Sequence, residues 1–137
     1  MPDTQPPKDA LRDAATVILV RRDRQVPRVL MGQRGKGAAF MPSKFVFPGG
    51  AVDREDREIT AATPLPEPTA RRLRLRPRPG SSGTPDLAEP LAMAAIRELW
   101  EETGLALSHP TGARPDGLTP DWQSFFDAGH RPAADGL

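Results

Sequence analysis

The pattern of apolar and polar positions predicts three strands in the first third of the chain. Ala15–Val20 is a β-branched apolar run bounded by charged residues, as is typical of a buried strand. Arg28–Gln33 predicts a second strand, and the turn residues between the two runs predict a hairpin. Lys44–Phe47 predicts a third, short strand. Pro48-Gly49-Gly50 is expected to end it in a turn that leaves the backbone open to close approach.

The strongest helical pattern runs from Glu89 to Thr103. Pro90 suits the first helical turn, and Gly104 is the expected C-terminal stop. Four apolar residues fall on one arc of this helix and are predicted to be buried, namely Met93, Ile96, Leu99 and Trp100.

The part of the chain after Thr103 carries weaker patterns. Leu105–Leu107 is expected to begin a strand, and 108–137 shows turn residues without a period-2 pattern. His109 and His130 are expected in loops without a functional role. One apolar cluster is expected on a short helix, as core rather than as a base-stacking platform: Trp122, Phe125 and Phe126.

Residues 61–86 differ in composition from their surroundings. They hold six prolines and five arginines, which predicts a mostly irregular inserted loop with a short ordered piece at Ala70–Leu75. The arginines are candidates to bind substrate phosphates or RNA. A solvated run is favoured over phosphate binding, because arginine runs in Pro-rich loops are more often solvated. RNA binding is disfavoured because no aromatic residues are interleaved. These arginines are Arg71, Arg72, Arg74, Arg76 and Arg78.

Composition and charge then narrow the function classes. The 137 residues suffice for one domain, expected at 13–137 after a flexible arm at 1–12. A net charge of +1 gives no bulk electrostatic case for binding nucleic acid or membrane. The sequence contains neither a run of ~20 apolar residues nor a signal peptide, so a cytoplasmic protein is predicted. It also lacks cysteine and tyrosine, which leaves acid–base chemistry mainly to carboxylates and lysines.

Three carboxylates gather on one side of the predicted helix, opposite its apolar arc. Glu98, Glu101 and Glu102 stand at i, i+3 and i+4, where their like charges repel. Such crowding makes sense if a divalent cation sits among them, because Mg²⁺ and Mn²⁺ prefer carboxylate oxygens. The alternative is a solvated glutamate-rich face. The cation is favoured because the neighbouring Arg97, the glycine stop and the Pro-Gly-Gly segment agree with a functional site.

The segment from Arg97 to Leu105 resembles the core of the Nudix box. The family's pattern is R-E, an apolar residue, any residue, E-E, any residue, G and an apolar residue, and this segment reads R-E-L-W-E-E-T-G-L. Phe47-Pro48-Gly49-Gly50 is similar to the strand and turn that lead into the family's box. Residues 15–20 and 28–33 are similar to the preceding strands, so the resemblance covers about 15–107. The segment 40–50 also resembles a branch related to coenzyme A diphosphatases, some of which carry an insertion inside the box.

One spacing departs from the family's pattern. The full box runs glycine, five residues, glutamate, seven residues and the R-E core. Glu89 has the correct spacing to Arg97, but Gly50 precedes Glu89 by 39 positions where the family uses 6. Gly83 satisfies the literal spacing. Gly50 is favoured because it follows a strand and a Phe-Pro-Gly. The prediction is a box split by the insertion at 61–86, with the backbone of Gly49 or Gly50 near Glu98.

The resemblance implies an α/β fold, a mixed β-sheet with flanking helices. It implies metal-dependent hydrolysis of a diphosphate bond in a nucleoside diphosphate linked to another moiety, of coenzyme A, dinucleotide or sugar-nucleotide type. The partner would then be a small molecule, with no nucleic acid or membrane, and a homodimer is a further expectation. Mg²⁺ or Mn²⁺ would be held by Glu98, Glu101, Glu102 and the Gly49 carbonyl, with Glu89 in metal support or in a structural role. By this resemblance each of the three helix glutamates is a candidate base, and Arg97 would orient them. The candidates to bind substrate phosphates are Gly49, Gly50 and Arg34.

The end of the chain gives a second hypothesis. In the family most of the sheet and a second helix follow the box, whereas only a short segment without strand patterns follows Leu105 here. The domain is therefore expected to be incomplete over 108–137. The alternative function is a truncated, catalytically inactive Nudix-derived chain or a binding module.

Overall fold

The computed structural model describes residues 11–39, 42–76 and 86–137. Three sequence-based predictions lie outside these ranges: most of the flexible arm, Arg78, and the alternative box glycine Gly83. The strands are β1 (Ala14–Thr16), β2 (Val20–Arg21), β3 (Arg28–Val29), β4 (Gly32–Gln33), β5 (Phe45–Val46), β6 (Gly49–Ala51), β7 (Ser108–His109) and β8 (Arg131–Pro132). The helices are the 3-10 helix η1 (Glu55–Arg57) and the α-helices α1 (Glu67–Arg74), α2 (Ala88–Thr103) and α3 (Pro120–Asp127).

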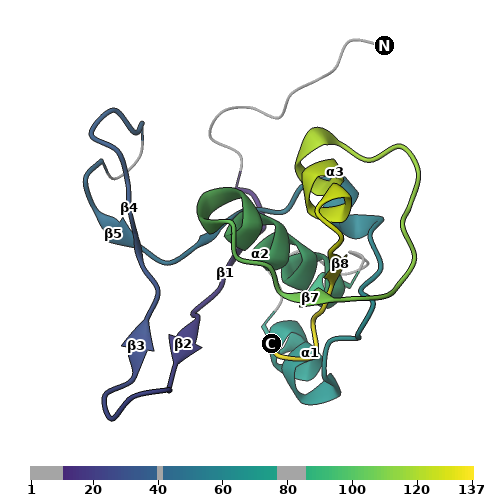
Figure 1. The fold of residues 1–137 in the computed structure, drawn as a ribbon, viewed down its shortest axis with the longest axis horizontal. Helices are drawn as coiled ribbons and strands as arrows, with labels where there is room; N and C mark the ends of the chain where they lie inside the picture. The colour runs from purple at the N-terminus through teal and green to yellow at the C-terminus, as the bar shows by residue number, and fades with distance from the viewer. Residues whose placement is uncertain (1–10, 40–41, 77–85) are drawn as a thin grey trace.

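Helix α2 is the centre of the fold. It packs against β1, β6, η1, α1 and α3. The strands β1 to β5 lie on one side of it, whereas α1, α3, β7 and β8 lie on the other (Figure 1). Met93, Ile96 and Leu99 are fully buried, as the helical pattern predicts, whereas Trp100 is only partly buried. Gly104 ends the helix with a φ of 72°, and its N–H donates to the Trp100 carbonyl at 2.8 Å. The predicted helix and its glycine stop are therefore confirmed.

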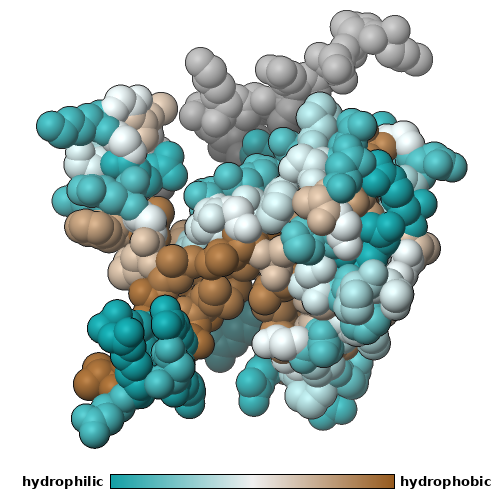
Figure 2. Space-filling view, in the orientation of Figure 1, coloured by the Kyte–Doolittle hydropathy of each residue, from teal (hydrophilic) through white to brown (hydrophobic). Residues whose placement is uncertain are grey.

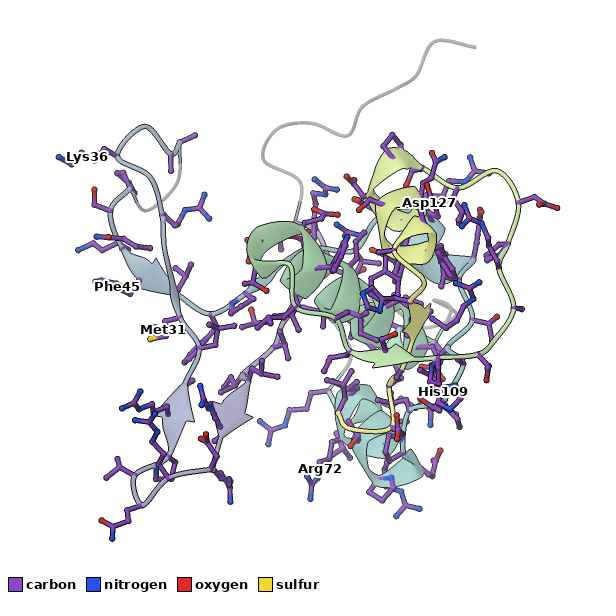
Figure 3. All side chains as sticks on the ribbon, in the orientation of Figure 1. Met31, Lys36, Phe45, Arg72, His109 and Asp127 are labelled. Carbon is purple, nitrogen blue, oxygen red and sulfur yellow. The ribbon has the colours of Figure 1, made fainter. Side chains whose placement is uncertain are left out.

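The predicted hairpin is confirmed, but each of its two long strands is divided. β2 pairs with β3 in the antiparallel sense, while β1 pairs with β6 and β4 pairs with β5. The single strand predicted over 15–20 therefore changes partner between Val17 and Val20. The β2–β3 and β4–β5 ladders project away from the helices (Figure 1). Met31 and Phe45 lie on the outer side of these ladders (Figure 3), and Phe45 is 65% exposed.

The turn predicted at Pro48-Gly49-Gly50 is wrong, because Gly49–Ala51 forms strand β6. Gly49 and Gly50 stand opposite Thr16 and Ala15 in the ladder with β1. A Cβ atom at Gly49 would lie only 2.3 Å from the Ala15 carbonyl oxygen. Glycine is therefore used here for the close approach of two strands rather than for a turn.

Residues 61–76, the described part of the predicted insertion, are more ordered than predicted. Helix α1 begins three residues before the ordered piece expected at Ala70–Leu75, and Ala70 is buried in the core cluster. The start of the segment also pairs with the end of the chain. Ala62 N–H donates to the Pro132 carbonyl at 2.8 Å, and Ala134 N–H donates to the Thr63 carbonyl at 3.0 Å.

Residues 108–137 form α3 and a small antiparallel ladder. The predicted short helix is confirmed, and its aromatic side chains are core residues with exposed fractions of 0 to 2%: Trp122, Phe125 and Phe126. β7 pairs with β8, so His109 lies in a strand rather than a loop, and no strand forms at Leu105–Leu107. Two-residue strands, one of them ending in Pro132, carry no period-2 signal from which they could be predicted.

Apolar side chains gather on the surface between the projecting ladders and the helices (Figure 2). A groove of about 420 Å³ is lined by residues of β1, α1, α2 and the last residues of the chain, among them Val17, Leu73, Leu91 and Leu137. Within the described ranges, no helix has the length and apolar character needed to cross a membrane.

Candidate functional site

Glu98 and Glu102 of α2 lie against strand β6. A Cβ atom at Gly50 would be 2.2 Å from Oε1 of Glu98, so the carboxylate directly covers this glycine. The Gly49 N–H donates to Oε2 of Glu102 at 3.2 Å. The predicted proximity of the Gly49-Gly50 backbone to Glu98 is thus confirmed. Residues separated by 48 positions in the sequence form one site.

Arg97 forms a buried ion pair with Asp56. Its Nε donates to Oδ1 and its Nη2 to Oδ2, both at 2.9 Å, and the exposed fractions of the two side chains are 4% and 0%. This two-point geometry fixes the plane of the guanidinium. Removing one partner of such a pair leaves an uncompensated buried charge, which typically costs about 3–5 kcal/mol.

The other nitrogens of Arg97 reach the glutamates and β6. Nη1 donates to Oε1 of Glu98 at 3.0 Å and to Oε1 of Glu101 at 2.9 Å. Nη2 also donates to the Ala51 carbonyl at 2.9 Å. One guanidinium therefore connects η1, β6 and two of the three glutamates, which is the geometry that an orienting arginine needs.

Asp56 is the site residue that the sequence reasoning missed. It stands six positions after Gly50, which is the box spacing of glycine, five residues and an acid. Glu89 has the correct spacing to Arg97, but it is exposed in the first turn of α2, about 12 Å along the helix axis from Arg97. The structure brings Asp56 to the arginine and leaves Glu89 away from it. Counting forward from Gly50, rather than back from Arg97, would have found Asp56.

The contact between Asp56 and Arg97 also shows which part of the box is lengthened. Gly50 and Asp56 keep the family's spacing, so the additional residues fall between Asp56 and Arg97, which are 41 positions apart where the box has 8. They include the whole of α1, which packs on α2.

The site has more negative than positive charge. Arg97 lies 2.9 to 3.5 Å from carboxylate oxygens of four acids, Asp53, Asp56, Glu98 and Glu101. Burial and the neighbouring Glu102 and Asp53 raise the pKa of Glu98 above the usual carboxyl range, although Arg97 opposes this. Burial and the charges of Glu98 and Asp121 likewise raise the pKa of Glu101, again against Arg97.

The pKa of Arg97 is shifted in the direction that keeps it charged. Burial alone would lower it, but hydrogen bonds to Asp56 and Glu101 and the charges of Asp56 and Glu98 outweigh burial and raise it. The guanidinium is therefore a permanent cation at the base of the site.

The chemistry of these side chains suits a hard divalent cation. They offer carboxylate oxygens, an excess of negative charge and partly desolvated glutamates that a cation would stabilise. Among residues 11–39, 42–76 and 86–137, however, no three acidic or histidine side chains converge as they would around a bound ion. Arg97 donates to Oε1 of Glu98 and to Oε1 of Glu101, so the Oε2 atom of each carboxylate is not bound to Arg97.

Arg34 lies directly after β4, on the ladder that leads through β5 towards β6. Its backbone N–H donates to the Lys44 carbonyl at 2.9 Å. Its Nε is buried and has no hydrogen-bond partner among the described residues, which is an uncommon state for a guanidinium N–H. An anion is the kind of group that would satisfy it.

Comparisons with known proteins give a consistent result, although no family model matches the chain. The putative nudix hydrolase 7 of Caenorhabditis elegans is 34% identical over 114 residues, which are 83% of this chain and 28% of that protein. The acyl-coenzyme A diphosphatase NUDT19 of Gallus gallus is 36% identical over 109 residues, which are 67% of this chain and 28% of that protein. The chain thus spans less than a third of the length of both curated relatives.

One solved structure has the same fold over most of the chain. It is the crystal structure of a NUDIX hydrolase from Alicyclobacillus acidocaldarius, with a TM-score of 0.58 and 26% sequence identity. The match covers 92% of this chain and 58% of that one. The predicted α/β fold class is confirmed by this neighbour and by the mixture of small sheets and helices.

Proposed function

Because the chain belongs to the Nudix family, we propose that it hydrolyses a diphosphate bond in a nucleoside diphosphate linked to another moiety, with Mg²⁺ or Mn²⁺ as cofactor. The observation that carries this proposal is the contact between Glu98 and Gly50. It brings together the two parts of a box that the sequence separates, next to Arg97, which donates hydrogen bonds to Glu98 and Glu101.

In this proposal Glu98, Glu101 and Glu102 hold the metal, and the Gly49 carbonyl is a further candidate ligand. A bound divalent ion would neutralise the diphosphate and help to deprotonate the attacking water. Arg97, held by Asp56, keeps the Glu98 and Glu101 carboxylates directed to one side of α2.

One glutamate would accept the proton of the water that attacks phosphorus, as the P–O–P bond breaks to give two phosphate products. Glu98 and Glu101 suit this role because burial raises the pKa of both towards neutrality. Arg34, with its unpartnered Nε, and the backbone of Gly49 and Gly50 are the candidates to bind the substrate phosphates.

Coenzyme A and its acyl derivatives are the first substrates to test. The support is the relative from Gallus gallus, whose name is that of an acyl-coenzyme A diphosphatase, together with the resemblance of the segment before Gly50 to that branch. Dinucleotide and sugar-nucleotide substrates share the diphosphate chemistry and follow in the same panel.

A non-catalytic binding module is the second candidate function. The observation that favours it is the lack of a convergent set of metal-binding side chains within the described ranges. In that case the site would bind a nucleotide without hydrolysing it.

The experiment is a hydrolysis assay with Mg²⁺, Mn²⁺ or excess chelator. The panel is coenzyme A, an acyl-coenzyme A, NADH, ADP-ribose, oxidised dGTP and a diadenosine polyphosphate. E101Q removes a site carboxylate, and E89Q is the matched control, an acid-to-amide change on the same helix outside the site. The hydrolase predicts metal-dependent turnover that E89Q retains and E101Q loses. If no substrate is turned over faster than by E101Q, the hydrolase proposal fails, and calorimetric binding of a nucleotide of the panel in excess chelator would then favour the binding module.

A further inference from the structure

The glutamate site consists of Asp56, Arg97, Glu98 and Glu101, and helix α3 donates a buried hydrogen bond to its Asp56. Nε1 of Trp122 donates to Oδ1 of Asp56 at 2.9 Å, and the same oxygen accepts from Nε of Arg97. Oδ2 of Asp56 accepts from Nη2 of Arg97 and from the Asp53 N–H. Asp56 therefore receives four hydrogen bonds from described residues, and the indole supplies the one that comes from α3.

The indole of Trp122 is held firmly in this orientation. Its side chain is fully buried, and it makes an edge contact with Phe125 at a ring-centroid distance of 5.4 Å and an angle of 83°. The start of α3 is joined to η1 as well, because the Thr119 N–H and hydroxyl both donate to the Glu55 carboxylate. Two consecutive residues of η1, Glu55 and Asp56, are thus bound to α3.

A series of hydrogen bonds connects α3 to Glu98 and Glu101 in three steps. Trp122 holds Oδ1 of Asp56, Asp56 holds two nitrogens of Arg97, and the remaining nitrogen of Arg97 holds Glu98 and Glu101. Without the indole N–H, Oδ1 would keep only one donor among the described residues. The plane of the guanidinium would then be less restricted.

We propose that Trp122 is a positioning residue of the glutamate site: acting through Asp56, its indole N–H sets the orientation of Arg97 and so the metal affinity of Glu98 and Glu101. This inference rests on the proposed function of those glutamates as metal ligands. It assigns α3 a part in the site, although no residue of α3 belongs to the box.

The second tryptophan supplies a matched control. Nε1 of Trp100 donates to Oγ of Ser124 at 2.7 Å, so it also links α2 to α3 by an indole hydrogen bond. This bond touches neither Asp56 nor Arg97. S124A removes its acceptor, while W122F removes the proposed positioning bond and keeps an aromatic ring in the core.

The test measures Mn²⁺ binding to the full chain by calorimetry and electron paramagnetic resonance, without reference to turnover. Folding of each variant is checked by circular dichroism. Loss of a residue that supports metal ligands typically weakens metal binding about 10–100-fold, so W122F is expected to bind at least about 10-fold more weakly than the wild type. S124A should bind like the wild type, and E101Q should lose binding.

The outcomes separate the inference from the proposed function. If W122F and S124A bind alike while E101Q does not bind, Trp122 has no positioning role and the glutamate site stands. If the wild type binds no Mn²⁺, or E101Q binds as well as the wild type, the proposed metal site fails and the inference fails with it.

A measurement on the wild type covers the case in which W122F does not fold. The chain has two tryptophans, so a ¹H–¹⁵N spectrum holds two indole signals, which S124A distinguishes. On titration with Mg²⁺ the Trp122 indole signal should shift more than that of Trp100. A Trp122 signal that stays fixed while Mg²⁺ saturates the site would overturn the inference.

Discussion

The carboxylate of Glu98 fills the space beside Gly50 that a side chain at that position would need. A Cβ atom at Gly50 would lie 2.2 Å from Oε1 and 2.5 Å from Cδ of Glu98. The neighbouring Gly49 has a different reason to be glycine. A Cβ there would meet backbone, 2.3 Å from the Ala15 carbonyl oxygen and 2.8 Å from Cα of Thr16. Gly50 makes room for the Glu98 carboxylate, and Gly49 makes room for the neighbouring strand β1.

This difference predicts opposite effects of two alanine substitutions. In G50A the clashing atoms belong to the end of a flexible side chain, so the fold should persist while Glu98 moves and Mn²⁺ binding weakens about 10-fold. In G49A the clashing atoms belong to β1, so the β1–β6 ladder must separate and the free energy of unfolding should fall by more than in G50A. Urea denaturation and calorimetric Mn²⁺ titration measure the two effects. Equal losses of stability in the two variants would contradict this account.

The features that sequence patterns predicted are local ones. The apolar arc of α2, its stop at Gly104 and the β2–β3 hairpin each follow from residues a few positions apart. The cluster Trp122, Phe125 and Phe126 likewise lies on a short helix, as its spacing indicates.

The features that were missed depend on contacts between distant residues. β6 was expected to be a turn because Gly49 and Gly50 have turn propensity, and only the pairing with β1 makes them a strand. Asp56 was missed because its partner Arg97 is 41 positions away, across a segment of unusual composition. Glu89 has the family's spacing to Arg97 because both lie on α2. The acid that pairs with Arg97 is instead Asp56, which lies on η1. The roles of the site residues themselves stay predictions.

The buried pair of Arg97 and Asp56 should be worth much more than a surface pair. R97K keeps the charge but cannot make the two-point contact, so a buried carboxylate oxygen loses its donor and we expect the free energy of unfolding to fall by about 1–3 kcal/mol. The matched control is R114K, which changes an exposed arginine paired with Asp127, with side chains 40% and 54% exposed. Such a pair contributes roughly 0–1 kcal/mol. Urea unfolding of both variants gives the comparison, and a loss in R97K no larger than in R114K would show that the buried geometry does not stabilise the fold.

Gly104 allows a measurement of backbone cost without steric interference. Its φ of 72° is in the left-handed region, and no atom lies within 4 Å of a Cβ built there. G104A should therefore destabilise the chain by about 1 kcal/mol through backbone strain alone. Gly35 also has open space at the Cβ position but lacks a positive φ, which makes G35A the matched control with an expected change within about 0.5 kcal/mol. Thermal or urea unfolding measures the free energy of unfolding of both variants. Similar losses in G104A and G35A would contradict backbone strain at the end of α2.

The stability of the metal-free chain should depend on pH through Glu98. Burial raises the pKa of Glu98 in the folded state, and Glu102 and Asp53 add to this against the opposing effect of Arg97. Between the ordinary carboxyl pKa and this raised value, the folded state holds more protons than the unfolded state. The contribution of Glu98 to the free energy of unfolding therefore falls as pH rises through that window.

E98Q removes this titration, so its stability relative to the wild type should increase as pH rises above the ordinary glutamate pKa of about 4. The measurement is urea unfolding at several pH values in excess chelator, with E89Q, an exposed acid-to-amide change on the same helix, as the baseline. Saturating Mg²⁺ should reverse the trend for the wild type, because the ion binds the deprotonated glutamates and stabilises the folded state. If the stability difference between E98Q and the wild type follows the E89Q baseline, the surroundings do not raise the pKa of Glu98. If that difference decreases as pH rises, Arg97 outweighs burial and lowers this pKa.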